Sequence, residues 1–147
     1  MSTPRIGVIV VAAGGGARLG GEIPKPWRLL SGIPLVERSW RTFLPDSLRA
    51  HSQNSMSEVR VLVAAQDRQD AARRLADAGS TPAIVAVGGA TRMDSVRAGL
   101  AALPATADLV AVHDAARPFW PVAMWDELIE TLIAKIPRKG DHDRFDN

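Results

Sequence analysis

The 147-residue sequence contains no cysteine. Disulfide bonds, thiolate catalysis and cysteine-ligated metal sites are therefore excluded. No apolar run is long enough to cross a bilayer, and the amino terminus lacks a secretory hydrophobic segment, so we expect a cytoplasmic protein without membrane contact. The formal net charge of +2 is too small to predict nucleic-acid binding.

Lysine is scarce as well: of the 18 basic residues, only Lys25, Lys135 and Lys139 are lysines. Apolar residues make up 46% of the chain and charged residues 23%, which is typical of a soluble globular protein. The length suits one domain with a buried core.

The stretch over residues 8–25, VIVVAAGGGARLGGEIPK, carries the clearest pattern. Its β-branched run is typical of a strand that is buried on both faces, as in a parallel sheet. The following glycines let the backbone turn and present amide groups to an anion, and Arg18 and Lys25 add two cations. These features predict a nucleotide-phosphate site at the carboxyl end of the first strand.

Two familiar glycine loops do not match this stretch. A dinucleotide fingerprint starting at Gly14 requires glycine at position 19, where the chain has Leu19. A P-loop requires serine or threonine after a glycine-lysine pair, whereas Lys25 lies between Pro24 and Pro26. The remaining pattern, A-A-G-x-G-x-R-x-G-x-x-x-P-K, resembles the signature loop of the sugar-nucleotidyltransferase superfamily. A structural glycine turn with two solvated cations is the alternative.

Strand and helix patterns alternate four times along the chain. We expect strands over residues 6–12, 58–65, 83–87 and 109–112, and helices over residues 34–44, 67–78, 91–103 and 121–136. This alternation predicts an α/β fold with a Rossmann-like, mainly parallel sheet and helices on both faces.

Local signals mark the ends of several elements. Asp67 is the predicted N-cap of the second helix, and Thr91 and Asp94 resemble a capping pair at the start of the third. We expect an apolar anchor at Trp27, Leu29 and Leu30 and a turn at Ser31 and Gly32. Residues 45–57 are predicted to form a surface loop.

Three segments fall at strand ends, where ligands bind in open α/β sheets. They are the glycine loop, GGATRMDSV over residues 88–96 and VHDAARP over residues 112–118. Together they resemble the 2-C-methyl-D-erythritol 4-phosphate cytidylyltransferase family of the non-mevalonate isoprenoid pathway, over about residues 6–130. The pair G-G-x-x-R-x-x-S-V and H-D-A-A-R-P is far more specific than the glycine loop alone.

The resemblance implies a role for each matching residue. Arg18 and Lys25 match the catalytic cations that neutralise the triphosphate. Asp114 matches a carboxylate beside a catalytic Mg²⁺, and Arg117 matches an arginine near the second substrate. The nucleotide-binding positions that it implies are Ala12, Ala13, Gly14, Gly15, Gly16, Gly89, Ala90 and Ser95.

The implied chemistry is the transfer of CMP from CTP to a polyol phosphate, 2-C-methyl-D-erythritol 4-phosphate, with release of pyrophosphate. Phosphoryl-type transfer depends on positioning and charge stabilisation, which fixed cations supply. Magnesium needs only one or two carboxylates besides phosphate oxygens and waters, so Asp114 alone suffices. The rival functions are a ribitol-phosphate cytidylyltransferase and a CTP-binding module without turnover.

Structural roles remain open for several of these residues. Asp114 would then only cap a turn, Ser95 would bond a carbonyl one helical turn back, and Arg117 would form a surface ion pair. His113 is interpreted as a packed residue at a strand end rather than a catalyst. Arg92 has two equal interpretations, as a residue that holds the Gly88–Gly89 turn or as a nucleotide contact.

The resemblance ends near residue 136. Family members continue with further strands, an arm that makes a homodimer and motifs for the second substrate, none of which occurs over residues 136–147. We therefore expect an incomplete nucleotide-binding domain over residues 1–136 and a disordered tail over residues 137–147, from a truncation, a shifted reading frame or an artificial end. A cut sheet would expose an unpaired edge, which favours self-association.

Overall fold

The computed structural model describes residues 5–14, 23–43, 57–79, 83–119, 121 and 123–135. Its centre is a sheet of four parallel strands in the order β5-β4-β1-β6. The strands are β1 (Arg5–Ala12), β4 (Ser57–Ala64), β5 (Ala83–Val87) and β6 (Leu109–Asp114). The β-branched run of β1 is buried along its length because this strand has neighbours on both sides and helices on both faces.

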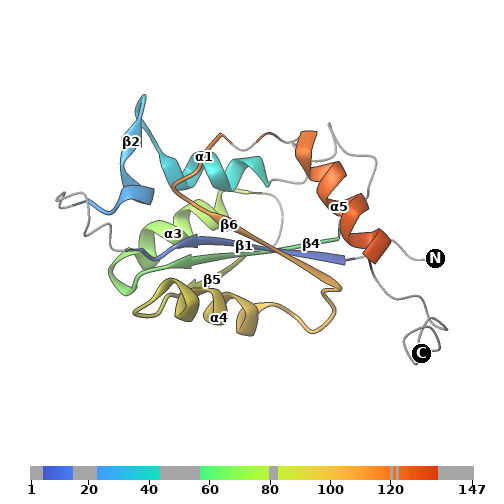
Figure 1. Ribbon diagram of the computed structural model, residues 1–147. Coiled ribbons are helices and arrows are strands. Elements are labelled where there is room, and N and C mark those ends of the chain that lie inside the picture. Colours follow the sequence, from blue (N-terminus) through green and yellow to red (C-terminus); the bar gives the residue numbers. More distant parts are fainter. Residues whose placement is uncertain are drawn as a thin grey trace.

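Four helices cover the sheet: α1 (Leu35–Thr42), α3 (Gln69–Asp77), α4 (Arg92–Ala102) and α5 (Ala123–Lys135). Figure 1 shows α4 on one face and α1 and α5 on the other. Two 3-10 turns, η2 (Lys25–Trp27) and η3 (Gln66–Arg68), and a small antiparallel pair, β2 (Leu29–Leu30) and β3 (Ile33–Pro34), complete the described elements. The expected α/β fold with a parallel sheet and helices on both faces is confirmed.

Each face of the sheet has its own apolar cluster. On one face, the even-numbered β1 residues Ile6, Val8 and Val10 belong to a cluster with large side chains from α1 and α5, namely Trp40, Phe43, Trp125 and Ile129. On the other face, Ile9 and Val11 lie with Val61 and Val63 of β4 and with Val96 of α4. The alternation of side chains along β1 thus divides the core into two layers.

The strand β6 continues two residues beyond the predicted end at Val112 and takes in His113 and Asp114. In its parallel register with β1, His113 is level with Val10 and Asp114 with Val11. Laterally paired residues of a sheet point to the same face. His113 therefore faces α1 and α5, and Asp114 faces α4.

The predicted capping pair of α4 is confirmed. The Thr91 hydroxyl accepts the Asp94 amide N–H at 3.1 Å, and the Asp94 carboxylate accepts the Thr91 amide N–H at 3.2 Å. Such a cap stabilises a helix by about 1 kcal/mol. It also fixes where α4 begins, directly after the Gly88–Gly89 segment.

The predicted N-cap at Asp67 is wrong. Asp67 lies inside η3, and α3 begins at Gln69 without a side-chain cap. The Gln69 side chain instead donates hydrogen bonds to the carbonyls of Ala64 at 2.8 Å and Ala86 at 3.2 Å. These bonds tie the start of α3 to the ends of β4 and β5.

The apolar anchor expected at Trp27, Leu29 and Leu30 is only partly present. Trp27 is half-buried, but Leu29 is 67% exposed and Leu30 38% exposed, because both belong to the β2–β3 hairpin at the surface. The predicted turn is confirmed: Ser31 has φ 51° and Gly32 has φ 79°, the left-handed pair that such tight hairpins require.

The helix predicted over residues 121–136 is described over Ala123–Lys135. No helix in the described ranges is both long and apolar enough to cross a membrane. Of the predicted loop over residues 45–57, positions 45–56 lie outside the described residues. The predicted tail over residues 137–147 also lies outside them.

Candidate functional site

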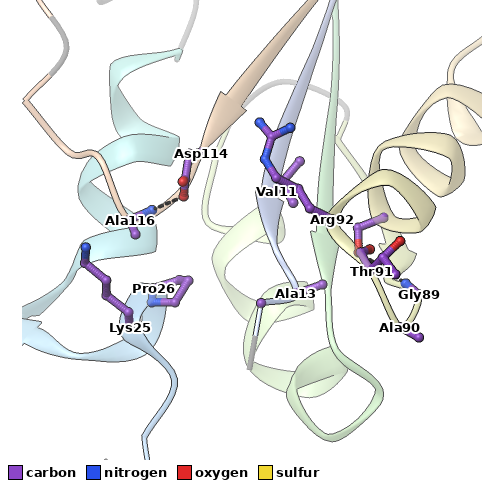
Figure 2. A pocket seen from close by; sticks show the side chains of 12 residues that line it. Val11, Ala13, Lys25, Pro26, Gly89, Ala90, Thr91, Arg92, Asp114 and Ala116 are labelled. Carbon is purple, nitrogen blue, oxygen red and sulfur yellow. Dashed lines mark hydrogen bonds between the residues drawn. The ribbon is translucent and has the colours of Figure 1, made fainter. Parts of the chain in front are cut away.

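A cavity of about 240 Å³ opens at the carboxyl ends of β1, β5 and β6 (Figure 2). Parts of all three segments that the sequence placed at strand ends contribute to its wall, together with η2. The lining residues are Val11, Ala13, Gly14, Lys25, Pro26, Gly89, Ala90, Thr91, Arg92, Ser95, Asp114 and Ala116. The fold therefore brings together segments that lie up to about a hundred positions apart in the sequence.

Lys25 reaches this cavity because its short turn is fixed to the end of β1. The Trp27 amide N–H donates to the Pro24 carbonyl at 2.9 Å, which closes η2. The Trp27 indole N–H donates to the Ala12 carbonyl at 3.3 Å, and Pro26 is buried beneath the turn. Lys25 itself is exposed and has no ion pair with any described residue. Its ammonium group is thus available to a ligand.

The Gly88–Gly89 segment packs so closely that neither position has space for a side chain. A Cβ on Gly88 would lie 2.1 Å from the Cβ of Ala13, and one on Gly89 would lie 2.3 Å from the Cβ of Asp94. The Gly88 amide N–H donates to the Ala64 carbonyl at 2.9 Å. Glycine at both positions therefore lets the start of α4 close one side of the cavity.

Ser95 is 2% exposed and lines the cavity. Its hydroxyl donates to the Thr91 carbonyl at 3.2 Å, which is the bond one helical turn back that a structural role predicts. The same oxygen accepts the Gly89 amide N–H at 3.2 Å. A hydroxyl oxygen has two lone pairs, so one acceptor position remains for a ligand.

Asp114 holds the turn that follows β6 and also faces the cavity. Its Oδ1 accepts the Ala116 amide N–H at 2.9 Å (Figure 2). The next residue is fixed on both sides: the Ala115 amide N–H donates to the Val11 carbonyl at 3.0 Å, and the Ser39 hydroxyl donates to the Ala115 carbonyl at 2.8 Å. Within the described part of the chain, Oδ2 of Asp114 makes no hydrogen bond, so this oxygen is available to a cation.

The donor set fits a magnesium ion that is held mainly by a substrate. The described residues contain no group of three or more acidic or histidine side chains that could enclose a metal. Magnesium commonly takes one or two carboxylate ligands and completes its octahedron with phosphate oxygens and waters. The single carboxylate of Asp114 beside a cavity that also contains Lys25 matches this pattern.

His113 lies on the other face of β6 and does not line the 240 Å³ cavity. Its Nε2 donates to the Arg117 carbonyl at 2.8 Å, and its ring packs edge-on against Phe43 with centroids 5.0 Å apart. Burial lowers the pKa of His113 below its ordinary value of 6.5, and the Arg117 carbonyl and the charge of Asp114 oppose only part of that shift. The interpretation of His113 as a packed residue is confirmed.

Arg117 is exposed and lies just outside the cavity. It borders a second cavity of about 520 Å³ that runs along β6. No carboxylate among the described residues forms an ion pair with it, so the surface ion pair of the alternative interpretation is not observed there.

The structure thus places five of the predicted nucleotide-binding residues, together with Lys25 and Asp114, around one cavity: Ala13, Gly14, Gly89, Ala90 and Ser95. Ala12 is buried beneath it and contributes its carbonyl to the Trp27 contact. Arg18, Gly15 and Gly16 lie outside the described residues. The sequence interpretation did not assign to the site the wall residues Val11, Pro26, Thr91 and Ala116, and it left Arg92 open between a turn residue and a nucleotide contact. The alternation of side chains along β1 is a signal that could have indicated Val11.

Comparison with known proteins agrees with this geometry. The family model described as 2-C-methyl-D-erythritol 4-phosphate cytidylyltransferase matches residues 6–137. The chain belongs to this family. Among curated members, it is 43% identical over 137 residues to the bifunctional enzyme IspD/IspF of Clavibacter michiganensis, covering 90% of this chain and 31% of that protein. It is 38% identical over 135 residues to the 2-C-methyl-D-erythritol 4-phosphate cytidylyltransferase of Streptomyces avermitilis, covering 89% of this chain and 51% of that protein.

Solved structures share this fold. The 4-diphosphocytidyl-2C-methyl-D-erythritol synthase of Anaerococcus prevotii superposes with a TM-score of 0.70 at 25% identity, over 88% of this chain and 51% of that chain. A Mycobacterium tuberculosis protein shares the fold with a TM-score of 0.63 at 18% identity, over 90% of this chain and 62% of that chain. The chain spans from about a third to a half of the length of the curated family members it matches.

Proposed function

We propose that this chain binds CTP in the 240 Å³ cavity and takes part in the transfer of CMP from CTP to 2-C-methyl-D-erythritol 4-phosphate, with release of pyrophosphate. One observation carries the proposal: Lys25 and Asp114, which match the family's cation and carboxylate, line the same cavity, one from η2 and the other from the end of β6. The proposal extends the activity of the family to a chain that is shorter than its relatives.

In the proposed reaction, a phosphate oxygen of the acceptor attacks the α-phosphorus of CTP in line, and the bond to the pyrophosphate oxygen breaks. Negative charge accumulates on the phosphoryl oxygens, where a fixed cation stabilises the transition state most. Lys25 supplies this charge from a turn that Trp27 and Pro26 keep in place. We assign Arg18 as a second cation on the basis of the sequence motif.

Asp114 would hold the magnesium ion of this reaction through its Oδ2. When bound, the ion neutralises charge on the phosphate oxygens. The bond from the Ala116 amide to Oδ1 keeps the carboxylate in one orientation. The contacts of Ala115 with Val11 and Ser39 fix the backbone that carries it.

The opposite side of the cavity suits a cytosine ring. The remaining lone pair of the Ser95 hydroxyl oxygen can accept a hydrogen bond from the N4 amino group of cytosine. Uracil has a carbonyl oxygen at that position, which cannot donate such a bond. Backbone groups of Gly89 and Ala90 on α4's side, and of Ala13 and Gly14 on β1's side, line the same space. We also assign Ala12, Gly15 and Gly16 to nucleotide binding from the motif.

Calorimetric titration with CTP in the presence of Mg²⁺ tests the proposal, with UTP, ATP and GTP as controls. We expect CTP to bind more tightly than the other three, and omission of Mg²⁺ to weaken it. Pyrophosphate release with methylerythritol phosphate or ribitol phosphate then measures turnover and the choice of acceptor. Equal affinity for all four nucleotides, or none, would overturn the proposed nucleotide site.

A further inference from the structure

The cavity along β6 meets the nucleotide cavity at two residues. Its volume is about 520 Å³, and its walls are mostly apolar side chains of β6 and α5, such as Leu109, Val112 and Leu132. Arg92 and Asp114 are the residues that line both this cavity and the 240 Å³ cavity. The two cavities therefore adjoin at Arg92 and Asp114, and we call this place the passage.

Arg92 is the first residue of α4 and is exposed. Its side chain makes no hydrogen bond or ion pair with any described residue. The nearby carboxylate of Asp94 is engaged elsewhere, with Thr91 and with Arg97 at 3.7 Å. In the view of Figure 2, the Arg92 side chain extends from α4 toward the side on which Asp114 lies. The interpretation of Arg92 as a nucleotide contact agrees with its place in the wall of the 240 Å³ cavity, whereas its place at the second cavity was not predicted.

The two charges at the passage do not neutralise one another. Arg92 and Asp114 both lie on the α4 side of the sheet, but they are too far apart to form an ion pair, which requires 4 Å or less. The guanidinium can therefore accept an anion without breaking an existing contact. Arginine binds phosphate through two parallel N–H donors, a geometry that lysine cannot reproduce.

We propose that Arg92 binds the phosphate group of the acceptor substrate and holds it at the passage between the two cavities. This inference rests on the proposed function, because it takes the 240 Å³ cavity as the nucleotide site. Because Arg92 lines both cavities, a phosphate monoester that it binds from the β6 side lies next to the nucleotide cavity. Asp114, on the other side of the passage, bears negative charge and disfavours the same anion unless a cation is bound there.

The test measures the binding of each substrate separately, so that no turnover occurs. Arg92→Gln removes the charge, Arg92→Lys keeps it without the planar fork, and Arg97→Gln is the matched control on the same helix. We expect Arg92→Gln to weaken methylerythritol phosphate binding by about tenfold or more, the effect of losing a charged hydrogen bond. Arg92→Lys should recover part of the affinity. Because Arg92 also lines the nucleotide cavity, CTP affinity should fall in Arg92→Gln, but by clearly less than acceptor affinity. Arg97→Gln should bind both ligands as the wild type does.

The outcomes separate this inference from the proposed function. If wild-type protein binds CTP selectively but Arg92→Gln retains full acceptor affinity, the inference is wrong and the nucleotide site stands. If acceptor binding depends on Arg92 while CTP does not bind, Arg92 binds the acceptor phosphate, but the proposed nucleotide site, and with it the position of that phosphate beside a nucleotide, is wrong. An equal loss of CTP and acceptor affinity in Arg92→Gln, or no acceptor binding by the wild type, also overturns the inference.

Discussion

The two faces of the sheet are built from side chains of different size. The face covered by α1, α3 and α5 buries Trp40, Phe43 and Trp125. Among the described residues, the cluster on the face covered by α4 contains no aromatic side chain, and α4 lies so close that a Cβ on Gly99 would be 2.6 Å from Ile9 Cγ2. Large side chains stabilise the first face, whereas close backbone approach on the second face positions the candidate site.

The last two residues of β6 show how the chain divides these tasks. His113 faces the aromatic cluster and packs against Phe43. Asp114, one position later, faces α4 and the cavity. Changes on the aromatic face should therefore mainly alter stability, and changes around the 240 Å³ cavity should alter nucleotide binding. The following predictions test whether the two effects are separable.

The largest expected effect is on the aromatic face. Trp125 is fully buried and packs edge-on against Phe43 with ring centroids 5.7 Å apart. Replacement Trp125→Ala should lower the free energy of unfolding by about 3–5 kcal/mol, because it removes a large apolar side chain and leaves a cavity. Urea unfolding followed by circular dichroism measures the change.

The neighbouring Met124 provides the control, because it lies on the same helix and is 51% exposed. Met124→Ala should change the free energy of unfolding by no more than about 0.5 kcal/mol. If both variants were equally stable, α5 would not contribute to the aromatic cluster as described.

The second prediction concerns the cavity. Lys25→Ala should lower CTP affinity by about 10–100-fold, because a charged contact to the triphosphate is lost. Turnover should fall by on the order of 10²–10³-fold, as when one transition-state donor is removed. Because Lys25 is exposed, the free energy of unfolding should change by no more than about 0.5 kcal/mol.

Lys135→Ala is the matched control, since Lys135 is an exposed lysine in the last turn of α5, outside the cavity. It should leave both nucleotide binding and stability unchanged. Calorimetry with CTP and urea unfolding provide the two measurements. Normal CTP affinity in Lys25→Ala would contradict the assignment of Lys25.

Local patterns in the sequence were sufficient for the elements that depend on neighbouring residues. The strand Ala83–Val87 and the capping pair of Thr91 and Asp94 follow from short-range signals, and the structure agrees with both. The motifs also identified Lys25 and Asp114 as residues of one site, which the fold brings to one cavity.

Features that depend on tertiary packing were not predictable in this way. Leu29 and Leu30 are apolar but exposed, because a two-residue strand pairs at the surface instead of packing on the sheet. The end of β6 was placed too early, since pairing with β1 extends the strand through a polar pair of residues that no apolar pattern marks. The faces of His113 and Asp114 follow from that pairing alone.

The smallest predicted effect is a pH dependence that belongs to the aromatic face. The carbonyl of Arg117 can only accept, so Nε2 of His113 carries its proton and Nδ1 is the atom that gains one in acid. Burial holds the pKa of His113 below 6.5, so between the two pKa values the unfolded chain binds more protons than the folded one. The free energy of unfolding should therefore fall as the pH is lowered through 6.5 and level off below the folded-state pKa. Urea unfolding at several pH values between about 7.5 and 5.5 should show this slope in the wild type and a smaller slope in His113→Gln. Identical slopes, or a wild type that gains stability in acid, would mean that the desolvated ring of His113 does not link the aromatic face to pH.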